Sequence, residues 1–276
     1  ILSSFFWGSY WIPIRYINEI GKNSVWPIII SFLLLSIILI FPLIKSIKLL
    51  LKNKDIFFFL GNLISALGIA LYSESLLRGE IAKVVLLFYL CPVWGTILAK
   101  VILNKKFNFQ RYISLFLGII GLEIILGFDE GVFFPSMIVE YMALAAGFFW
   151  ALGLTFFHLS KTSEGVEKTA FTSIFIPIFF LILILVPGGR DMGITNINFS
   201  FNILLLWIFL FSIIWLLPSI LLTYMSVEVL DPGRINILLM FEVIIGITTA
   251  ALLTTEIIGI REMIGAIVII SAGAID

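Results

Sequence analysis

Long apolar runs dominate this chain and restrict the environment in which it can fold. Read between polar breaks, they lie at roughly 1–17, 25–44, 56–77, 81–103, 111–127, 137–158, 168–186, 202–227, 232–254 and 259–275. A helix needs about 20 apolar residues to cross about 30 Å of hydrocarbon. Runs such as 32–35 and 267–270 do not alternate in polarity, as the strands of a membrane barrel would. The pattern predicts an all-α integral membrane protein with ten transmembrane helices.

The composition excludes the soluble classes of protein. Hydrophobic residues make up 61% of the chain, charged residues only 12%, and mean hydropathy is +1.19, whereas a soluble domain carries about 25% charged residues. The 17 basic and 17 acidic residues cancel, so no bulk field recruits a nucleic acid or another polyanion. The single cysteine, Cys91, allows neither an internal disulfide nor a cysteine-based metal cluster. We therefore expect no metal, no cofactor and no nucleic-acid partner.

The lysines and arginines between the runs predict an orientation, because cytoplasmic loops are enriched in them. With a cytoplasmic N-terminus, eleven fall inside and six outside. The inner set is Lys45, Lys48, Lys52, Lys54, Lys100, Lys105, Lys106, Arg111, Lys161, Lys168 and Arg234. The outer set is Arg15, Lys22, Arg78, Lys83, Arg190 and Arg261. We expect a multi-pass protein of a cell membrane, of the bacterial inner-membrane type, with both termini cytoplasmic. The chain opens inside an apolar run, so we expect a few residues upstream of Ile1.

The two halves of the chain resemble each other. The Phe-Phe-Trp sequence that ends at Trp7 recurs at Trp150, and the fourth and fifth predicted spans align with the ninth and tenth at a constant offset of 151 residues. The matched positions include Glu80/Asp231, Lys83/Arg234, Cys91/Glu242, Pro92/Val243, Gly95/Gly246, Ser114/Gly265 and Gly121/Ala272. Five spans per half is an odd number, so the second half must be inverted relative to the first. This predicts two inverted five-helix repeats, residues 1–130 and 137–276. In secondary transporters of that architecture the substrate site lies near the midplane between the repeats.

Residues 231–243 (Asp-Pro-Gly-Arg-Ile-Asn-Ile-Leu-Leu-Met-Phe-Glu-Val) and the helix start at 261–265 resemble EamA-type transporters of the drug/metabolite transporter superfamily. The first half is similar through 88–95 and through the opening 6–9. The resemblance implies ten helices in two inverted repeats and transport of small organic solutes, without naming a substrate. This chain departs from the family pattern in two places. Its Glu-Pro pair is split between Pro92 and Glu242, and Asn104-Lys105 replaces Gly-Glu.

Glu242 is the acidic residue placed deepest in a predicted span. It follows Asp231 by eleven residues, which is about 16 Å of helix and close to the bilayer centre. A charge there costs about 2.5–3.5 kcal/mol on insertion scales, so it needs a partner or a wet cavity. Two interpretations stay open: a structural glutamate bonded to a neighbouring helix, or a cavity carboxylate that binds a substrate cation or a coupling proton.

Charged residues also gather where two pairs of spans meet. Lys83 and Arg234 each lie about one turn into a helix, where they either snorkel beside a local acid or gate a mouth of the pathway. Glu74 and Arg78 have the i,i+4 spacing of an ion pair. The candidate gate residues are Glu74, Arg78, Glu80, Lys83, Asp231 and Arg234.

Aromatic residues inside the spans could line a cavity for an organic solute. The candidate substrate-binding residues are Glu242, Trp7, Tyr72, Tyr89, Trp94, Trp150, Tyr224 and Asn236. Lipid contact or core packing is the alternative for each aromatic residue.

These features favour a secondary transporter that moves a small polar organic metabolite by alternating access through a central cavity between the repeats. Glu242 favours an amine-bearing solute such as an amino acid, with a proton as the candidate coupling ion. The alternative is an organic-anion exchanger or uniporter that holds its solute at Lys83 or Arg234. A membrane enzyme acting on lipid is disfavoured because there is one histidine and no Gly-x-Ser-x-Gly motif; we expect no enzyme and no catalytic residues. A channel would show oligomeric symmetry and a polar filter. We expect a monomer or a homodimer in the lipid bilayer.

Overall fold

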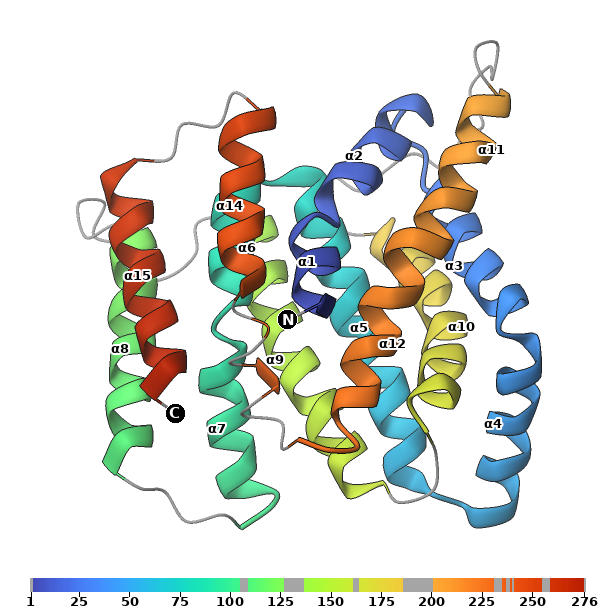
Figure 1. Cartoon of the computed structure of the whole chain (residues 1–276), viewed down its shortest axis with the longest axis horizontal. Helices are drawn as coiled ribbons and strands as arrows, with labels where there is room; N and C mark the ends of the chain where they lie inside the picture. The colour runs from blue at the N-terminus through green and yellow to red at the C-terminus, as the bar shows by residue number, and fades with distance from the viewer. Residues whose placement is uncertain are drawn as a thin grey trace.

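The computed structural model describes residues 2–104, 109–126, 137–160, 164–185, 201–230, 235–236, 239, 241–254 and 259–275. Its elements are helices (Figure 1). The first half contains α1 (Leu2–Gly8), α2 (Trp11–Ile20), α3 (Trp26–Ile38), α4 (Ile40–Asn53), α5 (Ile56–Arg78), α6 (Ile81–Phe88), α7 (Cys91–Val101) and α8 (Phe109–Leu126). The second contains α9 (Ile138–Leu159), α10 (Gly165–Leu183), α11 (Phe201–Leu210), the π-helical turn η2 (Phe211–Leu216), α12 (Leu217–Ser226), α14 (Phe241–Leu253) and α15 (Ile260–Ile275).

Prolines explain where the predicted spans are interrupted. α1 gives way to α2 shortly before Pro13, α3 to α4 before Pro42, and α6 to α7 before Pro92, while η2 precedes Pro218. A proline removes one backbone donor, and its ring clashes with the carbonyl one turn earlier, so the preceding turn must distort. Pro177 is an exception, because α10 continues through it.

The second predicted span differs from the structure in its course. We expected a run over 25–44, but the helix breaks at Leu39, and α3 and α4 meet at an angle of 78°. α4 then continues to Asn53. Pro42 lies in the first turn of α4, so the ring clash falls on the junction between the two helices.

Five of the described helical stretches are long and apolar enough to cross a membrane: 56–78, 81–101 (α6 and α7 together), 138–159, 165–183 and 202–226 (α11, η2 and α12 together). The bent pair α3–α4 is a sixth candidate. The other four predicted spans coincide with α1–α2, α8, α14 and α15, none of them a helix of more than 18 residues. The count of ten spans therefore stays a prediction.

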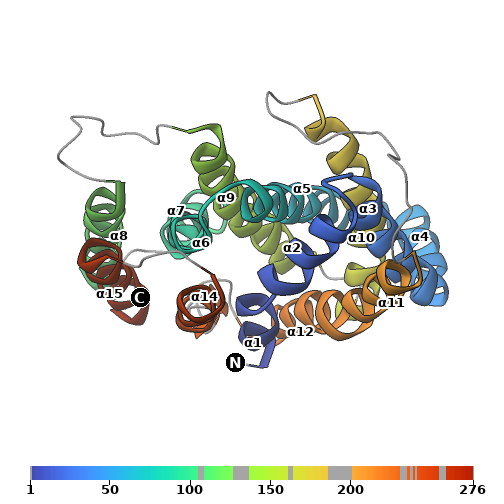
Figure 2. The same cartoon turned by 90° about the horizontal axis from the view of Figure 1, so that it is seen from above.

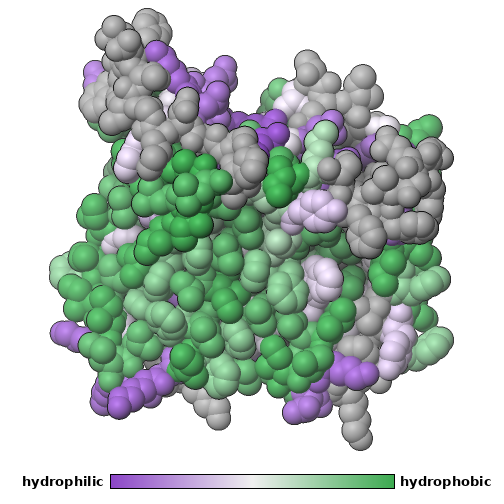
Figure 3. Space-filling view, turned by 180° about the vertical axis from the view of Figure 1, so that it is seen from behind, coloured by the Kyte–Doolittle hydropathy of each residue, from purple (hydrophilic) through white to green (hydrophobic). Residues whose placement is uncertain are grey.

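The surface is consistent with a lipid environment. In Figure 3 apolar residues cover the middle of the visible face, and hydrophilic residues gather toward its two ends. Large apolar side chains such as Phe41, Leu185 and Leu252 are exposed. In water such a surface would drive association, whereas in a bilayer it contacts acyl chains.

The interior is built around α5 and α9, which pack along one another at the centre of the molecule. Gly68 permits this approach, because a Cβ there would lie 3.0 Å from the backbone nitrogen of Trp150. Seen from above, α14, α1 and α12 lie along one side, and α6, α9 and α5 face them across the interior (Figure 2). α8 and α15 form a pair at one edge (Figure 1).

The helix pairs that the sequence repeat relates run in opposite directions. In Figure 1, α7 ends and α8 begins at the lower end of the molecule, whereas α14 ends and α15 begins at the upper end. An inverted repeat requires related helix pairs to run in opposite directions. Equal directions would indicate a parallel repeat and would contradict the prediction.

Candidate solute-binding site

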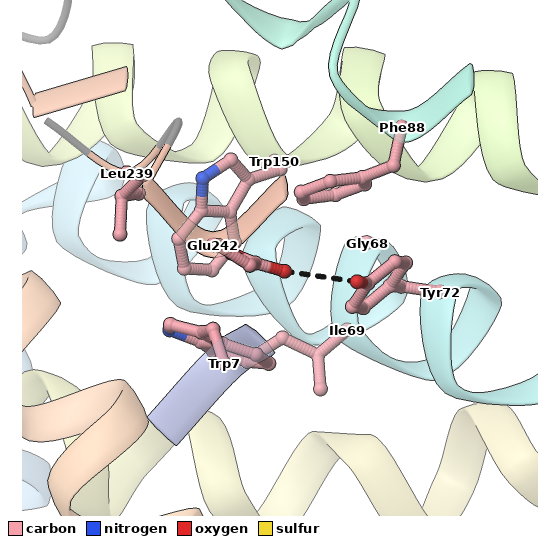
Figure 4. A pocket seen from close by; sticks show the side chains of 8 residues that line it. All are labelled: Trp7, Gly68, Ile69, Tyr72, Phe88, Trp150, Leu239 and Glu242. Atoms are coloured by element: carbon pink, nitrogen blue, oxygen red, sulfur yellow. Dashed lines mark hydrogen bonds between the residues drawn. The ribbon is translucent and has the colours of Figure 1, made fainter. Parts of the chain in front are cut away.

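A small cavity lies in the interior where α1, α5, α6 and α9 meet the start of α14 (Figure 4). Its lining residues are Trp7, Gly68, Ile69, Tyr72, Phe88, Trp150, Leu239 and Glu242, and all of them are buried. The cavity volume is about 10 Å³, which is room for about one water molecule. An organic solute can therefore enter only after the surrounding helices have moved apart.

Glu242 is the acidic residue among these eight lining residues. It lies in the first turn of α14 and is only 2% exposed. The Tyr72 hydroxyl donates a hydrogen bond to Glu242 Oε1 at 2.9 Å (Figure 4). The Tyr89 hydroxyl lies 2.5 Å from Glu242 Oε2 and also 2.6 Å from the backbone carbonyl oxygen of Leu239. The carboxyl group is thus held between two phenols and has no ion-pair partner among the described residues.

The break between α6 and α7 determines the position of Tyr89. α6 ends at Phe88, and α7 begins at Cys91 with Pro92 in its first turn. Tyr89 therefore leaves the regular helix, and its ring is fully buried with the hydroxyl directed at α14. Phe88, the last residue of α6, packs on Tyr72 with ring centroids 4.3 Å apart.

Aromatic rings surround the carboxyl group. Trp7 and Trp150 meet edge to face at 5.6 Å, and Trp7 lies 6.4 Å from Tyr72. Ring faces attract cations, most strongly where water is excluded. A buried carboxylate inside a box of such rings is chemically suited to a small organic cation.

The two tryptophans of the cavity differ in their indole nitrogens. Trp7 Nε1 donates to the carbonyl of Ser219 at 3.0 Å and to the Thr223 hydroxyl at 3.2 Å, both on α12. Trp150 Nε1 is buried with no hydrogen-bond partner among the described residues. An unmatched donor beside a cavity is free to bind an acceptor atom of a ligand.

Comparison with known proteins identifies the family. Residues 1–127 match the EamA-like transporter family. This part of the chain belongs to that family. The family resemblance predicted from the sequence is confirmed over these residues.

The fold of the chain recurs in solved structures, of which twelve chains match. One of them, titled only "Crystal structure of protein", superposes with a TM-score of 0.58 at 13% identity, over 99% of this chain and 94% of that chain. Identity this low shows the fold alone. No curated protein matches.

Four predicted site residues lie outside the cavity lining, and one of them, Tyr89, bonds to Glu242. Tyr224 is stacked behind Trp150 at 6.1 Å, and Thr172 bonds to its hydroxyl at 3.4 Å. Trp94 packs edge-on against a phenylalanine of α9. Asn236 is fully buried beside Gly95, and its amide has no partner among the described residues. The other four predicted binding residues line the cavity.

The predicted outer gate residues form a network with a partner that we had not expected. Arg78 and Glu74 make the i,i+4 pair at 3.9 Å. Lys83 Nζ pairs at 2.5 Å with Glu140 Oε1 on α9, rather than with Glu80. Glu80 is exposed and precedes α6 with extended backbone, whereas Glu140 is buried in the first turn of α9. Asp231 and Arg234 lie outside the described residues.

A second set of charges lies near the opposite end of the helices. Lys45 Nζ pairs at 2.5 Å with Glu167 Oε1, and Glu228 accepts a bond from the backbone nitrogen of Gly165 at the start of α10. Lys168, which follows Glu167 in the chain, is 2% exposed, and its ammonium group lies 5.6 Å from the centre of the Phe157 ring.

The sequence did not single out Phe88, Leu239, Glu140 or the Lys45–Glu167 pair. Phe88 was signalled only by its place beside Tyr89. The ion pairs join residues that are far apart in the chain, so no local spacing announces them.

Proposed function

We propose that this EamA-type protein is a secondary transporter for a small polar organic metabolite that carries an amine. The solute binds at the Glu242 cavity and crosses by alternating access between the two halves of the chain. Membership of the family supports transport in general; the solute class and the mechanism are our proposals.

The observation that carries the proposal is the Glu242 carboxyl group inside its aromatic box. A carboxylate at this depth needs a compensating positive charge, and the described residues around it supply none. An ammonium group would supply that charge, and the rings of Trp7, Tyr72 and Trp150 would hold it by cation–π attraction.

Trp150 restricts the chemical class of the solute further. Its free indole N–H needs an acceptor atom, such as a carboxylate or carbonyl oxygen on the same molecule. A solute with an ammonium group and a nearby carboxyl group has both features. An amino acid is therefore our first choice of substrate.

The proposed mechanism uses two inverted five-helix repeats, residues 1–130 and 137–276. The opposite directions of α7–α8 and α14–α15 support this division. So does the contact between Trp7 and Trp150, which occupy corresponding places in the Phe-Phe-Trp sequences of the two halves. The proline-associated breaks α1–α2 and α6–α7 flank the cavity and are the proposed hinges.

Energy for transport would come from an ion gradient, from exchange or from the solute gradient itself. The chain contains no Gly-x-x-x-x-Gly-Lys-Ser/Thr motif for ATP binding. We propose a proton as the coupling ion.

The organic-anion alternative is less well supported. It required Lys83 or Arg234 as the binding cation. Lys83 is engaged by Glu140 and is absent from the cavity lining, and Arg234 lies outside the described residues. We therefore favour the amine-bearing solute.

The test is counterflow in liposomes that contain the purified protein and are preloaded with single amino acids or amines. We expect saturable uptake of one labelled compound, and we expect Glu242→Gln to abolish it. Glu19→Gln is the matched control, because Glu19 is an exposed glutamate on α2. Wild-type counterflow in Glu242→Gln, with every amine tested, would contradict the proposal. Uptake without saturation or counterflow would indicate a channel.

A further inference from the structure

The Tyr89 hydroxyl contacts two acceptor groups at once. Its oxygen lies 2.5 Å from Glu242 Oε2 and 2.6 Å from the carbonyl oxygen of Leu239. Both distances are at the short end of the range for hydrogen bonds between oxygens. Each contact therefore needs a hydrogen atom between its two oxygens.

A phenol has one hydrogen to donate. If Glu242 is ionised, both its oxygens and the Leu239 carbonyl are acceptors only. Tyr89 can then donate its hydrogen to only one of the two oxygens. In the other contact, the lone pairs of two buried oxygens face each other with no hydrogen between them, and they repel. That arrangement is costly, because a buried polar contact without a hydrogen loses its compensation for desolvation.

A proton on Glu242 Oε2 supplies the missing hydrogen atom. The carboxyl group then donates to the Tyr89 oxygen, and Tyr89 donates to the Leu239 carbonyl. Tyr72 still donates to Oε1 at 2.9 Å. Each of the three contacts now holds one hydrogen.

Among the described residues, the surroundings of Glu242 offer no other source of compensation. The titratable groups that face it are Tyr72 from α5, Tyr89 from the α6–α7 break and Cys91 from the start of α7. All three are neutral in their ordinary protonated forms. α1 and α9 contribute the uncharged rings of Trp7 and Trp150. Lys83, on α6, is already paired with Glu140.

We propose that Glu242 is a proton-binding site and carries its proton in this closed conformation, with Tyr89 passing a hydrogen bond on to the Leu239 carbonyl. The exchange of this proton for an ammonium group rests on the proposed function, in which Glu242 also binds the solute. The carboxyl group cannot hold a proton on Oε2 and receive an ammonium group there at the same time. Binding of one R–NH₃⁺ therefore converts the carboxylic acid to a carboxylate and releases one H⁺, so the net charge of the site is unchanged.

Infrared spectroscopy of the purified protein in lipid nanodiscs tests the proton directly. We expect a carboxylic-acid C=O band at neutral pH that shifts on exchange into deuterium oxide. The band should disappear in Glu242→Gln and persist in Glu19→Gln. Absence of the band from the wild-type protein would overturn the proposal.

Tyr89→Phe tests the placement of the proton and does not depend on the folding of Glu242→Gln. Removing the phenol oxygen deprives the carboxyl hydrogen of its acceptor, so we expect the band to change frequency. Tyr16→Phe, at an exposed tyrosine of α2, should leave it unchanged. A band at the same frequency in Tyr89→Phe would show that the proton is not on Oε2.

The infrared spectrum and the transport assay test the two proposals separately. A Glu242 band in a protein that carries no amine in counterflow would contradict the proposed function and leave the proton site standing. Active amine counterflow without the band would overturn the proton site alone.

Discussion

Trp7 and Trp150 occupy matching places in the two halves and meet at the cavity, yet they are bonded differently. The Trp7 indole nitrogen is tied to α12 by two hydrogen bonds, whereas the Trp150 nitrogen has no partner among the described residues. Glu242 likewise has Cys91 as its repeat mate. The polar groups of the cavity are therefore not symmetric, as binding of a solute with two different ends requires.

We predict that phenylalanine at these two positions affects stability and transport differently. Trp7→Phe removes two buried bonds and should lower the free energy of unfolding by about 1–3 kcal/mol. Trp150→Phe removes an unmatched donor, so it should cost less stability but weaken solute transport. Thermal unfolding in detergent and liposome counterflow measure the two effects. Equal loss of stability in both variants, with transport intact in Trp150→Phe, would contradict this assignment.

At the scale of the helix, close approach between α1 and α14 positions the acid relative to the aromatic rings. Gly8 lies at the contact: a Cβ there would be 2.7 Å from the Ile245 Cβ and 2.8 Å from the carbonyl oxygen of Glu242. Gly246, on the facing helix, is not crowded, because its nearest neighbour would be 3.6 Å away.

Alanine at these two glycines should therefore change stability in opposite directions. In a helix, glycine to alanine gains up to about 1 kcal/mol. Overpacking costs about 1–3 kcal/mol, so Gly8→Ala should be destabilising overall. Gly246→Ala meets only ordinary contacts and should be neutral or stabilising. Thermal unfolding of the two variants in the same detergent checks this, and a Gly8→Ala protein as stable as wild type would refute the close packing.

The same elements show what the sequence could predict. Hydrophobicity located several helices to within a few residues, because it depends only on local composition; for example, 138–159 was expected at 137–158. The span expected at 25–44 is an exception, because α4 continues to Asn53. The breaks before Pro13, Pro42 and Pro92 carry a local signal that the continuous spans of our interpretation ignored. The depth of Glu242 indicated its burial, but not its partners. Tyr89–Glu242 and Lys83–Glu140 depend on how distant helices pack, which no single segment encodes.

At the scale of the whole molecule, ion pairs lie toward both ends, and the cavity between them has room for about one water molecule. The Lys83–Glu140 pair joins α6 to α9 across the two halves of the chain. Separating the halves at this end must break it. The pair should therefore stabilise the closed conformation relative to one that is open at this end.

Cys91 supplies a native reporter of that opening. It is the single cysteine of the chain, and it is fully buried. A maleimide can react with it only when the interior opens. Its labelling rate therefore follows the population of open molecules, as exchange and proteolysis do for other buried groups.

Lys83→Glu places two carboxylates where the ion pair was. A loss of about 1.4 kcal/mol would raise the open population, and hence the rate of Cys91 labelling, about tenfold. Glu140→Lys should act similarly, and the double variant should return toward the wild-type rate, because the swap restores the attraction. Lys48→Glu, at an exposed lysine of α4, is the control. If Lys83→Glu labels no faster than this control, the pair does not hold the molecule closed, and Lys83 merely anchors α6 at the interface.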